Sequence, residues 1–179
     1  MRITVKHYPY ITMSELKIRN TRTADIPRLQ SLFAIARRFM AVTGNPNQWA
    51  EDYPSVELIR EDIESGDSYA VVQDGRIVAT FVLRGGIDPT YHEIYDGKWI
   101  NDEPYATIHR IVSDGEVKGV MHLALQYALQ RYHSIRIDTH RDNKVMQHLL
   151  AKEGFLYCGI IHCWSGDERL AYQFVKQER

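Results

Sequence analysis

Two runs of strand-forming residues joined by a two-residue turn constrain the fold of this chain most. Residues 68–73 and 76–83 are rich in β-branched and aromatic side chains, and Asp74-Gly75 lies between them. A dipeptide of this kind favours the tight turns that join antiparallel strands. The sequence therefore predicts a β-hairpin over 68–83.

Helical periodicity appears on both sides of the hairpin. Apolar residues at 26, 29, 33, 36 and 40 recur at spacings that place them on one helix face, and Thr23 or Asp25 can cap this helix. Further helices are expected over 56–64, from 120 and from Asp142, and further strands over 17–21, 107–113, 134–139, 157–164 and 169–175. This order predicts an α/β (α+β) domain with one mixed, mostly antiparallel, twisted sheet of six to seven strands and helices on both faces.

The length of the chain is typical of one domain. Its 179 residues are too few for two well-filled cores. Residues 14–179 are expected to form that domain, and residues 1–13 are either an N-terminal arm or a stretch upstream of the true start.

Composition excludes several classes of function. Lys plus Arg (22) nearly balances Asp plus Glu (23), so no overall basic field would recruit nucleic acid or acidic lipid. No apolar run approaches the roughly 20 residues that cross a bilayer. We therefore expect a cytoplasmic protein, and we expect no disulfide between Cys158 and Cys163, whose odd separation in a strand points them to opposite faces.

A glycine-containing turn connects a strand directly to a helix. Residues 107–113 lead through Gly115 and Gly119 into the helix that begins at 120. Amides left free at such a helix start form an anion site, although glycine also ends strands merely to permit a turn.

The second half of the chain resembles the GCN5-related N-acetyltransferase (GNAT) superfamily. The segment 108–128 looks like its acetyl-CoA motif, and 143–155 looks like the segment with Asn, a helix and Gly-Phe that follows it. His109-Arg110-Ile111, Asp138-Thr139-His140 and Cys158-Gly159-Ile160 are similar to a bacterial subgroup of unassigned substrate.

The resemblance implies an acetyl-CoA (CoA) site and its residues. The main chain of Ile111 to Ser113, Val112 included, would pair with pantetheine, and Asn143 and Met146 would border the arm near the thioester. The pyrophosphate would be held by main-chain amides of five consecutive residues: Val117, Lys118, Gly119, Val120 and Met121.

Three positions depart from the family pattern. Glu116 and Met121 stand where the pyrophosphate loop usually begins with Gln or Arg and ends in Gly or Ala. Leu150 stands where the family often has a Tyr that protonates the leaving thiolate. This sequence therefore predicts that no acid acts from position 150.

Acetyl transfer to an amine requires a base and a polarised thioester carbonyl. His109 is the preferred base, because an imidazole ordinarily titrates near pH 6.5. The alternative is a strand histidine that is merely hydrogen-bonded. A main-chain amide near Val112 is expected to polarise the carbonyl.

The stretch 85–105 is irregular, acidic and aromatic, which suits a cationic amine. The alternative is a solvated loop anchored by aromatic packing. The predicted acceptor-binding residues come from this stretch and from the segment after the first helix: Trp49, Tyr53, Asp88, Tyr91, Trp99 and Tyr105.

We therefore expect an acetyl-CoA-dependent N-acetyltransferase that moves an acetyl group to a primary amine of a small molecule or peptide by direct transfer in a ternary complex. The alternative is a CoA-binding sensor or partner module with little transferase activity. No metal is expected, since no two of the eight histidines share a helix at a spacing of four. Strand edges near the C-terminus allow a homodimer.

Overall fold

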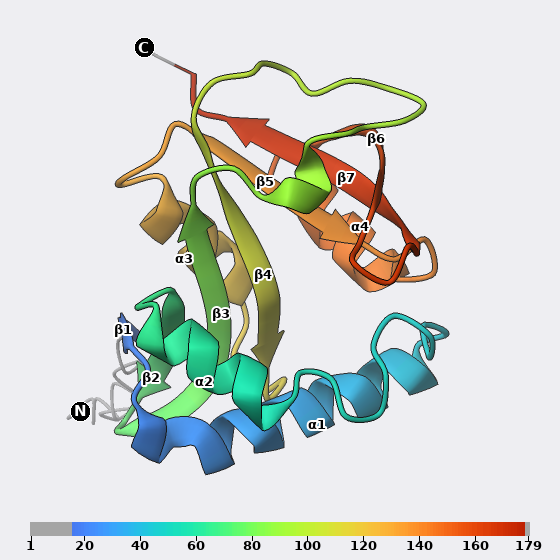
Figure 1. Cartoon of the computed structure of the whole chain (residues 1–179). Coiled ribbons are helices and arrows are strands. Elements are labelled where there is room, and N and C mark those ends of the chain that lie inside the picture. The colour runs from blue at the N-terminus through green and yellow to red at the C-terminus, as the bar shows by residue number, and fades with distance from the viewer. Residues whose placement is uncertain (1–15, 178–179) are drawn as a thin grey trace, which may run out of the picture.

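The computed structural model describes residues 16–177 and contains one seven-stranded sheet with helices on both faces (Figure 1). The predicted arm at residues 1–13 lies outside the described residues. The strands are β1 (Lys17–Asn20), β2 (Ser68–Gln73), β3 (Arg76–Gly85), β4 (Tyr105–Ser113), β5 (Ser134–Thr139), β6 (Leu156–His162) and β7 (Glu168–Val175). The α-helices are α1 (Ile26–Val42), α2 (Val56–Glu64), α3 (Val120–Ala128) and α4 (Lys144–Lys152). This order and architecture confirm the predicted fold class.

The sheet is antiparallel except at one place. Its strand order is β1-β2-β3-β4-β5-β7-β6, and only β4 and β5 run parallel. Their pairing covers just three residues of each strand, from Tyr105↔Ser134 to Thr107↔Arg136. The predicted hairpin is the β2–β3 pair, and Asp74 and Gly75 both have positive φ, as its tight turn requires.

Alternating side chains of the strands divide the core between the two faces. Tyr69 and Val71 of β2 pack with α3 and α4, whereas Ala70 between them packs with α1 and α2. Figure 1 shows α1 and α2 together on one side of the sheet, with α3 and α4 behind it. The parts of β4 and β5 that do not pair with each other therefore lie between these two layers of helices.

The long segment between β3 and β4 has its own anchor. Tyr91, from the short 3-10 helix Pro89–Tyr91, is buried together with Trp99 and with Ile161 of β6. Tyr95 pairs with Ile160 through two hydrogen bonds of 2.8 Å between their main chains. Gly97 permits this approach, because a Cβ there would lie 1.9 Å from the carbonyl oxygen of Cys158.

Several predicted ends differ from the observed ones. Asn143, not Asp142, caps α4, because its Oδ1 accepts from the Met146 amide at 3.0 Å. A 3-10 helix, Thr23–Asp25, precedes α1, and the Asp25 carboxylate bonds Arg19 and the Arg22 amide instead of capping α1. Both cysteines are free thiols. Among the described helices, none has the length and apolar character needed to cross a membrane.

Candidate active site

The candidate site is a cleft that opens where β4 separates from β5. Beyond Thr107 the two strands no longer pair, and a cavity of about 1130 Å³ begins there. Residues 108–115 line one side of it, and Ile137 and Asp138 of β5 line the other. Ile111, Val112 and Ser113, the predicted pantetheine-binding residues, therefore face this cleft, as do Asn143 and Met146.

A β-bulge shapes the β4 wall of the cleft. Thr80 of β3 pairs with Val112, but Val82 pairs with His109, so β4 carries one extra residue between these pairs. Arg110 lies within the bulge and has a φ of 49°, an uncommon value for a residue with a side chain. The main chain of β4 consequently turns away from the regular ladder beside His109.

The glycine turn places free amides at the start of α3. Gly119 is the N-cap residue, with a φ of 81°, and a Cβ built on it would meet no atom within 4 Å. The first amides of a helix have no partner within it, so those after Gly119 are available to an anion. The side chains of Val120 and Met121 are buried in the core, which leaves their main chain as the part that a ligand can reach.

The predicted pyrophosphate loop lies beyond the end of the cleft. Along the segment from β4 to α3, the last described residue that lines the cleft is Gly115. The lining therefore does not include Val117, Lys118, Gly119, Val120 or Met121. Glu116, the unusual acid of this loop, forms an ion pair with Arg76 of β3. Asp114 is likewise paired, with Arg28 at 3.0 Å and Arg76 at 3.5 Å. Nearby arginines therefore compensate both acids.

His109 forms a close pair with Asp88 in the cleft. Its Nε2 lies 2.8 Å from Asp88 Oδ2, and both side chains are largely buried. Asp88 Oδ1 accepts from the amide and hydroxyl of Thr90, at 2.9 and 2.7 Å. Burial alone would raise the pKa of Asp88, but the hydrogen bonds from His109 and Thr90 outweigh it and lower the pKa to about 2. Asp88 is therefore an ionised partner that orients the imidazole.

The six predicted acceptor residues fall into two groups. Trp49, Tyr53 and Asp88 line the cleft, and the rings of Trp49 and Tyr53 lie 5.4 Å apart. Tyr91, Trp99 and Tyr105 are instead buried beneath it, where the rings of Trp99 and Tyr105 enclose the Arg136 guanidinium at 4.0 and 3.9 Å. The surroundings of these three residues match the alternative, in which aromatic packing anchors the loop.

Two of the buried tyrosines form hydrogen bonds with acidic residues that line the cleft, one to a carboxylate and one to a main-chain amide. The Tyr91 hydroxyl donates to Asp138 Oδ1 at 2.6 Å, and the Tyr105 hydroxyl accepts from the Asp88 amide at 3.0 Å. Burial and the neighbouring Asp138 raise the pKa of Tyr91 well above its ordinary value. Tyr91 is thus a neutral donor that fixes the position of Asp138.

Gln48, in the loop after α1, bonds residues of α4 and β7 that line the cleft, and the sequence did not indicate these contacts. Gln48 Oε1 accepts from Asn143 Nδ2 at 2.8 Å, and the Gln48 carbonyl accepts from Arg169 Nη2 at 3.1 Å. Gln48 and Asn143 are 95 residues apart in sequence. No local pattern marks such a contact, so Gln48 and Arg169 were missed as residues of the site.

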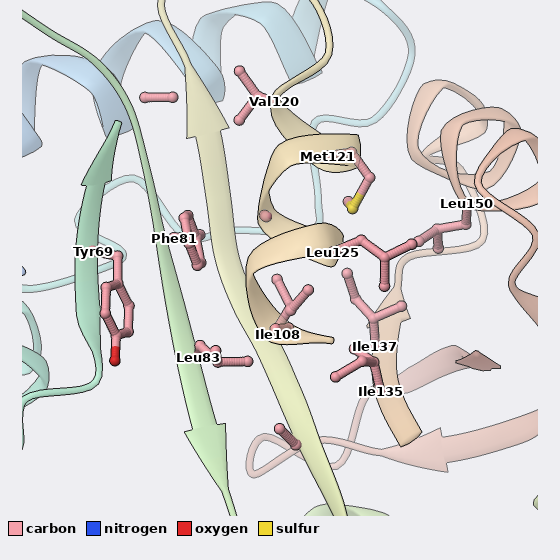
Figure 2. Close-up of a cluster of buried hydrophobic side chains, with 14 of the residues drawn as sticks. Tyr69, Phe81, Leu83, Ile108, Val120, Met121, Leu125, Ile135, Ile137 and Leu150 are labelled. Atoms are coloured by element: carbon pink, nitrogen blue, oxygen red, sulfur yellow. The ribbon is translucent and has the colours of Figure 1, made fainter. Parts of the chain in front are cut away.

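Leu150 belongs to the core and not to the cleft. It is fully buried with Met121, Leu125 and Ile137, as Figure 2 shows. No acid therefore acts from this position. Within residues 16–177, no group of three or more His, Cys, Asp or Glu side chains could hold a metal ion.

Comparison with solved structures identifies the family. An acetyltransferase of the GNAT family from Streptococcus agalactiae 2603 shares 33% identity, and the alignment covers 91% of this chain and 96% of that one with a TM-score of 0.82. The chain therefore belongs to the GNAT family of acetyltransferases.

More distant structures share the fold. A GNAT-family acetyltransferase from Listeria monocytogenes 4b F2365 is 17% identical over 89% of this chain and 94% of that one, with a TM-score of 0.66. A ribosomal-protein-alanine N-acetyltransferase from Brucella melitensis is 16% identical over 89% and 99%, with a TM-score of 0.59. No protein-family model and no curated protein sequence matches the chain.

Proposed function

We propose that this protein is an acetyl-CoA-dependent N-acetyltransferase that moves an acetyl group directly to a primary amine in a ternary complex. The observation that carries the proposal is the His109–Asp88 pair, held at 2.8 Å in a cleft between the diverging strands of an acetyltransferase fold. A histidine oriented by an ionised carboxylate can accept a proton from an attacking amine.

The residues of this chain fit the cofactor. The unpaired edge of β4 at Ile111 to Ser113 can pair with the pantetheine arm, and Asn143 and Met146 line the same cleft. The open space in front of Gly119 and the free amides after it suit a pyrophosphate. When bound, acetyl-CoA supplies the acetyl group as a thioester.

The proton transfer follows from the geometry of the pair. An amine acceptor reaches the cleft as an ammonium and must lose a proton before it can attack. His109 accepts that proton, directly or through water, on a ring nitrogen that Asp88 does not occupy. The Asp88 carboxylate then stabilises the imidazolium, because opposite charges at 2.8 Å attract strongly in a partly buried site.

The second requirement of the reaction is a polarised thioester carbonyl, which a main-chain amide can supply. The oxygen of this carbonyl gains negative charge as the amine attacks, and an amide that points toward it lowers the barrier. The bulge at Arg110 removes β4 from regular pairing with β3 just before Val112. We assign the polarising role to an amide at or next to Val112.

The acceptor half of the cleft favours a cation. Asp88, Asp138, Glu51 and Asp167 line the cleft together with the rings of Trp49 and Tyr53. Three arginines line it too, but Arg84 and Arg110 are paired with Asp62, and Arg169 lies 4.0 Å from Asp138. Aromatic faces and carboxylates both stabilise an ammonium group. The acceptor is therefore proposed to be an amine, either a small molecule or a peptide.

The test is release of CoA thiol from acetyl-CoA on addition of a panel of amines. We expect thiol to appear in proportion to acetylated amine. Release that is independent of amine, or no release with any amine under conditions where acetyl-CoA binds, would contradict the proposal.

One observation favours a second candidate, a CoA-binding sensor or partner module. Leu150 is fully buried in the core, so the thiolate receives no proton from this position. In the transferase, protonation must then come from water or from the proton released by the amine. Tyr157, a further candidate acid from the sequence, is not among the described residues that line the cleft. Tight binding of acetyl-CoA without amine-dependent release of thiol would support the module.

A further inference from the structure

We infer that Asp62, a buried carboxylate on α2, is a positioning residue for acetyl transfer, because through Arg110 it holds the β4 bulge beside the reacting groups. The inference rests on the proposed function. Asp62 is not among the described residues that line the cleft, whereas Arg110 lines it.

The bulge needs support from outside β4. Arg110 has a φ of 49°, in the left-handed region that a side chain with a Cβ disfavours. Such a conformation persists when the surrounding structure holds it in place. Arginine has no local hydrogen bond that would favour this conformation, as Asn or Asp has.

The support is a buried ion pair with two hydrogen bonds. Arg110 Nη2 donates to Asp62 Oδ1 at 2.7 Å, and Arg110 Nε donates to Asp62 Oδ2 at 3.0 Å. The side chains of Asp62 and Arg110 are only 3% and 10% exposed, so solvent screens the pair little. Paired hydrogen bonds between a guanidinium and a carboxylate also fix orientation, which a single contact would not do.

The same network reaches Tyr53, a proposed acceptor-binding residue. Arg110 Nη1 donates to the Tyr53 hydroxyl at 3.2 Å, and Tyr53 lines the cleft. Arg84 donates to Asp62 Oδ1 at 3.2 Å and completes the network. Asp62 thus connects α2 to both the bulge and Tyr53.

The position of Arg110 gives the pair its functional consequence. Arg110 lies directly between His109, the proposed base, and Ile111, which precedes the proposed polarising amide. When Arg110 loses its anchor, the backbone can relax toward a favoured φ, and both neighbours then move. Acetyl-CoA binding also depends on the amides at the start of α3, which lie outside the bulge, so it should weaken less than turnover does.

The test is the Asp62→Asn variant, which removes the charge and keeps the shape. We expect kcat to fall at least tenfold, while the KM and the calorimetric Kd for acetyl-CoA change by a clearly smaller factor. Asp67→Asn is the matched control, because Asp67 pairs with Arg84 at 2.9 Å and has no recorded contact with Arg110. This control should retain wild-type kcat.

A second variant tests the inference even if Asp62→Asn does not fold. Arg110→Gly accepts the positive φ without strain and leaves Asp62 paired with Arg84. Glycine has no side chain to anchor and adopts many other φ values, so the bulge is no longer held in place. This variant should therefore lower kcat to a similar extent, and the double variant should lose no more than either single variant.

The outcomes separate this inference from the proposed function. An inactive wild-type protein would overturn both. An active wild type would overturn only the inference if both variants keep kcat within twofold, if affinity for acetyl-CoA falls as much as kcat, or if the two losses add.

Discussion

The two sides of the cleft are built in different ways. On the proposed cofactor side, one continuous segment runs from β4, which lines the cleft, to the start of α3 beyond it and offers main-chain groups, and the side chains of Val120 and Met121 pack into the core. On the proposed acceptor side, side chains from the loop after α1, from the 86–104 segment and from β7 meet across long sequence separations. A site made from main chain depends on glycine and backbone shape, whereas a site made from side chains depends on residue identity. Substitutions should therefore affect the two sides differently.

The largest expected effect is on the cofactor side. Gly119→Val should weaken acetyl-CoA binding about 100-fold or more, because a branched side chain would occupy the open space in front of the free amides and is strained at a φ of 81°. Calorimetry measures this directly. Gly75→Val is a matched control, since Gly75 has a φ of 77° and equally open surroundings in the β2–β3 turn. If Gly119→Val binds as well as the control does, the assignment of this loop is wrong.

Replacing the proposed base should leave binding intact and remove turnover. His109→Gln is expected to lower kcat about 100-fold, the usual contribution of general base catalysis, with an unchanged Kd for acetyl-CoA. His122→Gln serves as the control, because His122 also pairs with a carboxylate, Glu153, at 2.8 Å but is exposed on α3. Equal turnover in the two variants would make His109 a structural residue of the sheet.

Replacing the partner of the base should have a smaller effect on rate. Asp88→Asn keeps the shape of the side chain but removes the charge that stabilises the imidazolium, and we expect kcat to fall about tenfold, within the range for a charge-assisted hydrogen bond. Steady-state kinetics at one pH checks this value. An unchanged kcat would show that the His109–Asp88 pair serves stability alone.

The same variant should show a pH-dependent loss of stability. The pKa of Asp88 is about 2 in the folded protein and 3.8 ordinarily, so its ionised form stabilises the fold by up to about 2 kcal/mol, less solvent screening. This stabilisation is complete above pH 3.8 and is lost as pH falls through 2. The difference in free energy of unfolding between wild type and Asp88→Asn should shrink as pH falls from 3.8 through 2. A difference that grows over this pH range would contradict the assigned direction of the shift.

The smallest expected effect on chemistry is at Leu150. Leu150→Ala should lower the free energy of unfolding by about 2–5 kcal/mol, because it leaves a cavity in the core, while kcat changes less than about threefold in the folded protein. Thermal melting and initial rates, compared at a temperature where both proteins are folded, measure the two quantities. A large loss of kcat with an unchanged melting temperature would show that this position has a role in catalysis.

The comparison between the two sides also explains what the sequence could predict. The β2–β3 hairpin and the glycine-containing start of α3 depend on neighbouring residues, so local patterns locate them. His109 and Asp88 were both selected, but their contact at 2.8 Å joins residues 21 apart through a bulge and a loop. Strand propensity gives no sign of that bulge, since Arg110 is not a residue that favours positive φ.

Aromatic residues show the limit of composition as a guide. Tyr91, Trp99 and Tyr105 occur in an acidic, irregular segment, which predicted an acceptor-binding site, with aromatic packing as the alternative. The structure instead packs them against Arg136 and Ile161, because a segment of this length needs its own buried cluster. Their contribution to the site is indirect, through hydrogen bonds from Tyr91 to Asp138 and from the Asp88 amide to Tyr105.

The pH profile of amine-dependent thiol release, measured for wild type and His109→Gln with one good amine, tests the central claim most directly. If His109 accepts the proton, the rate of the wild type rises with pH, because a general base acts in its unprotonated form, and His109→Gln is slower and lacks that rise. Binding of acetyl-CoA by the variant, measured in parallel, should match that of the wild type. A variant that retains the wild-type rate and the wild-type profile at every pH would contradict the claim.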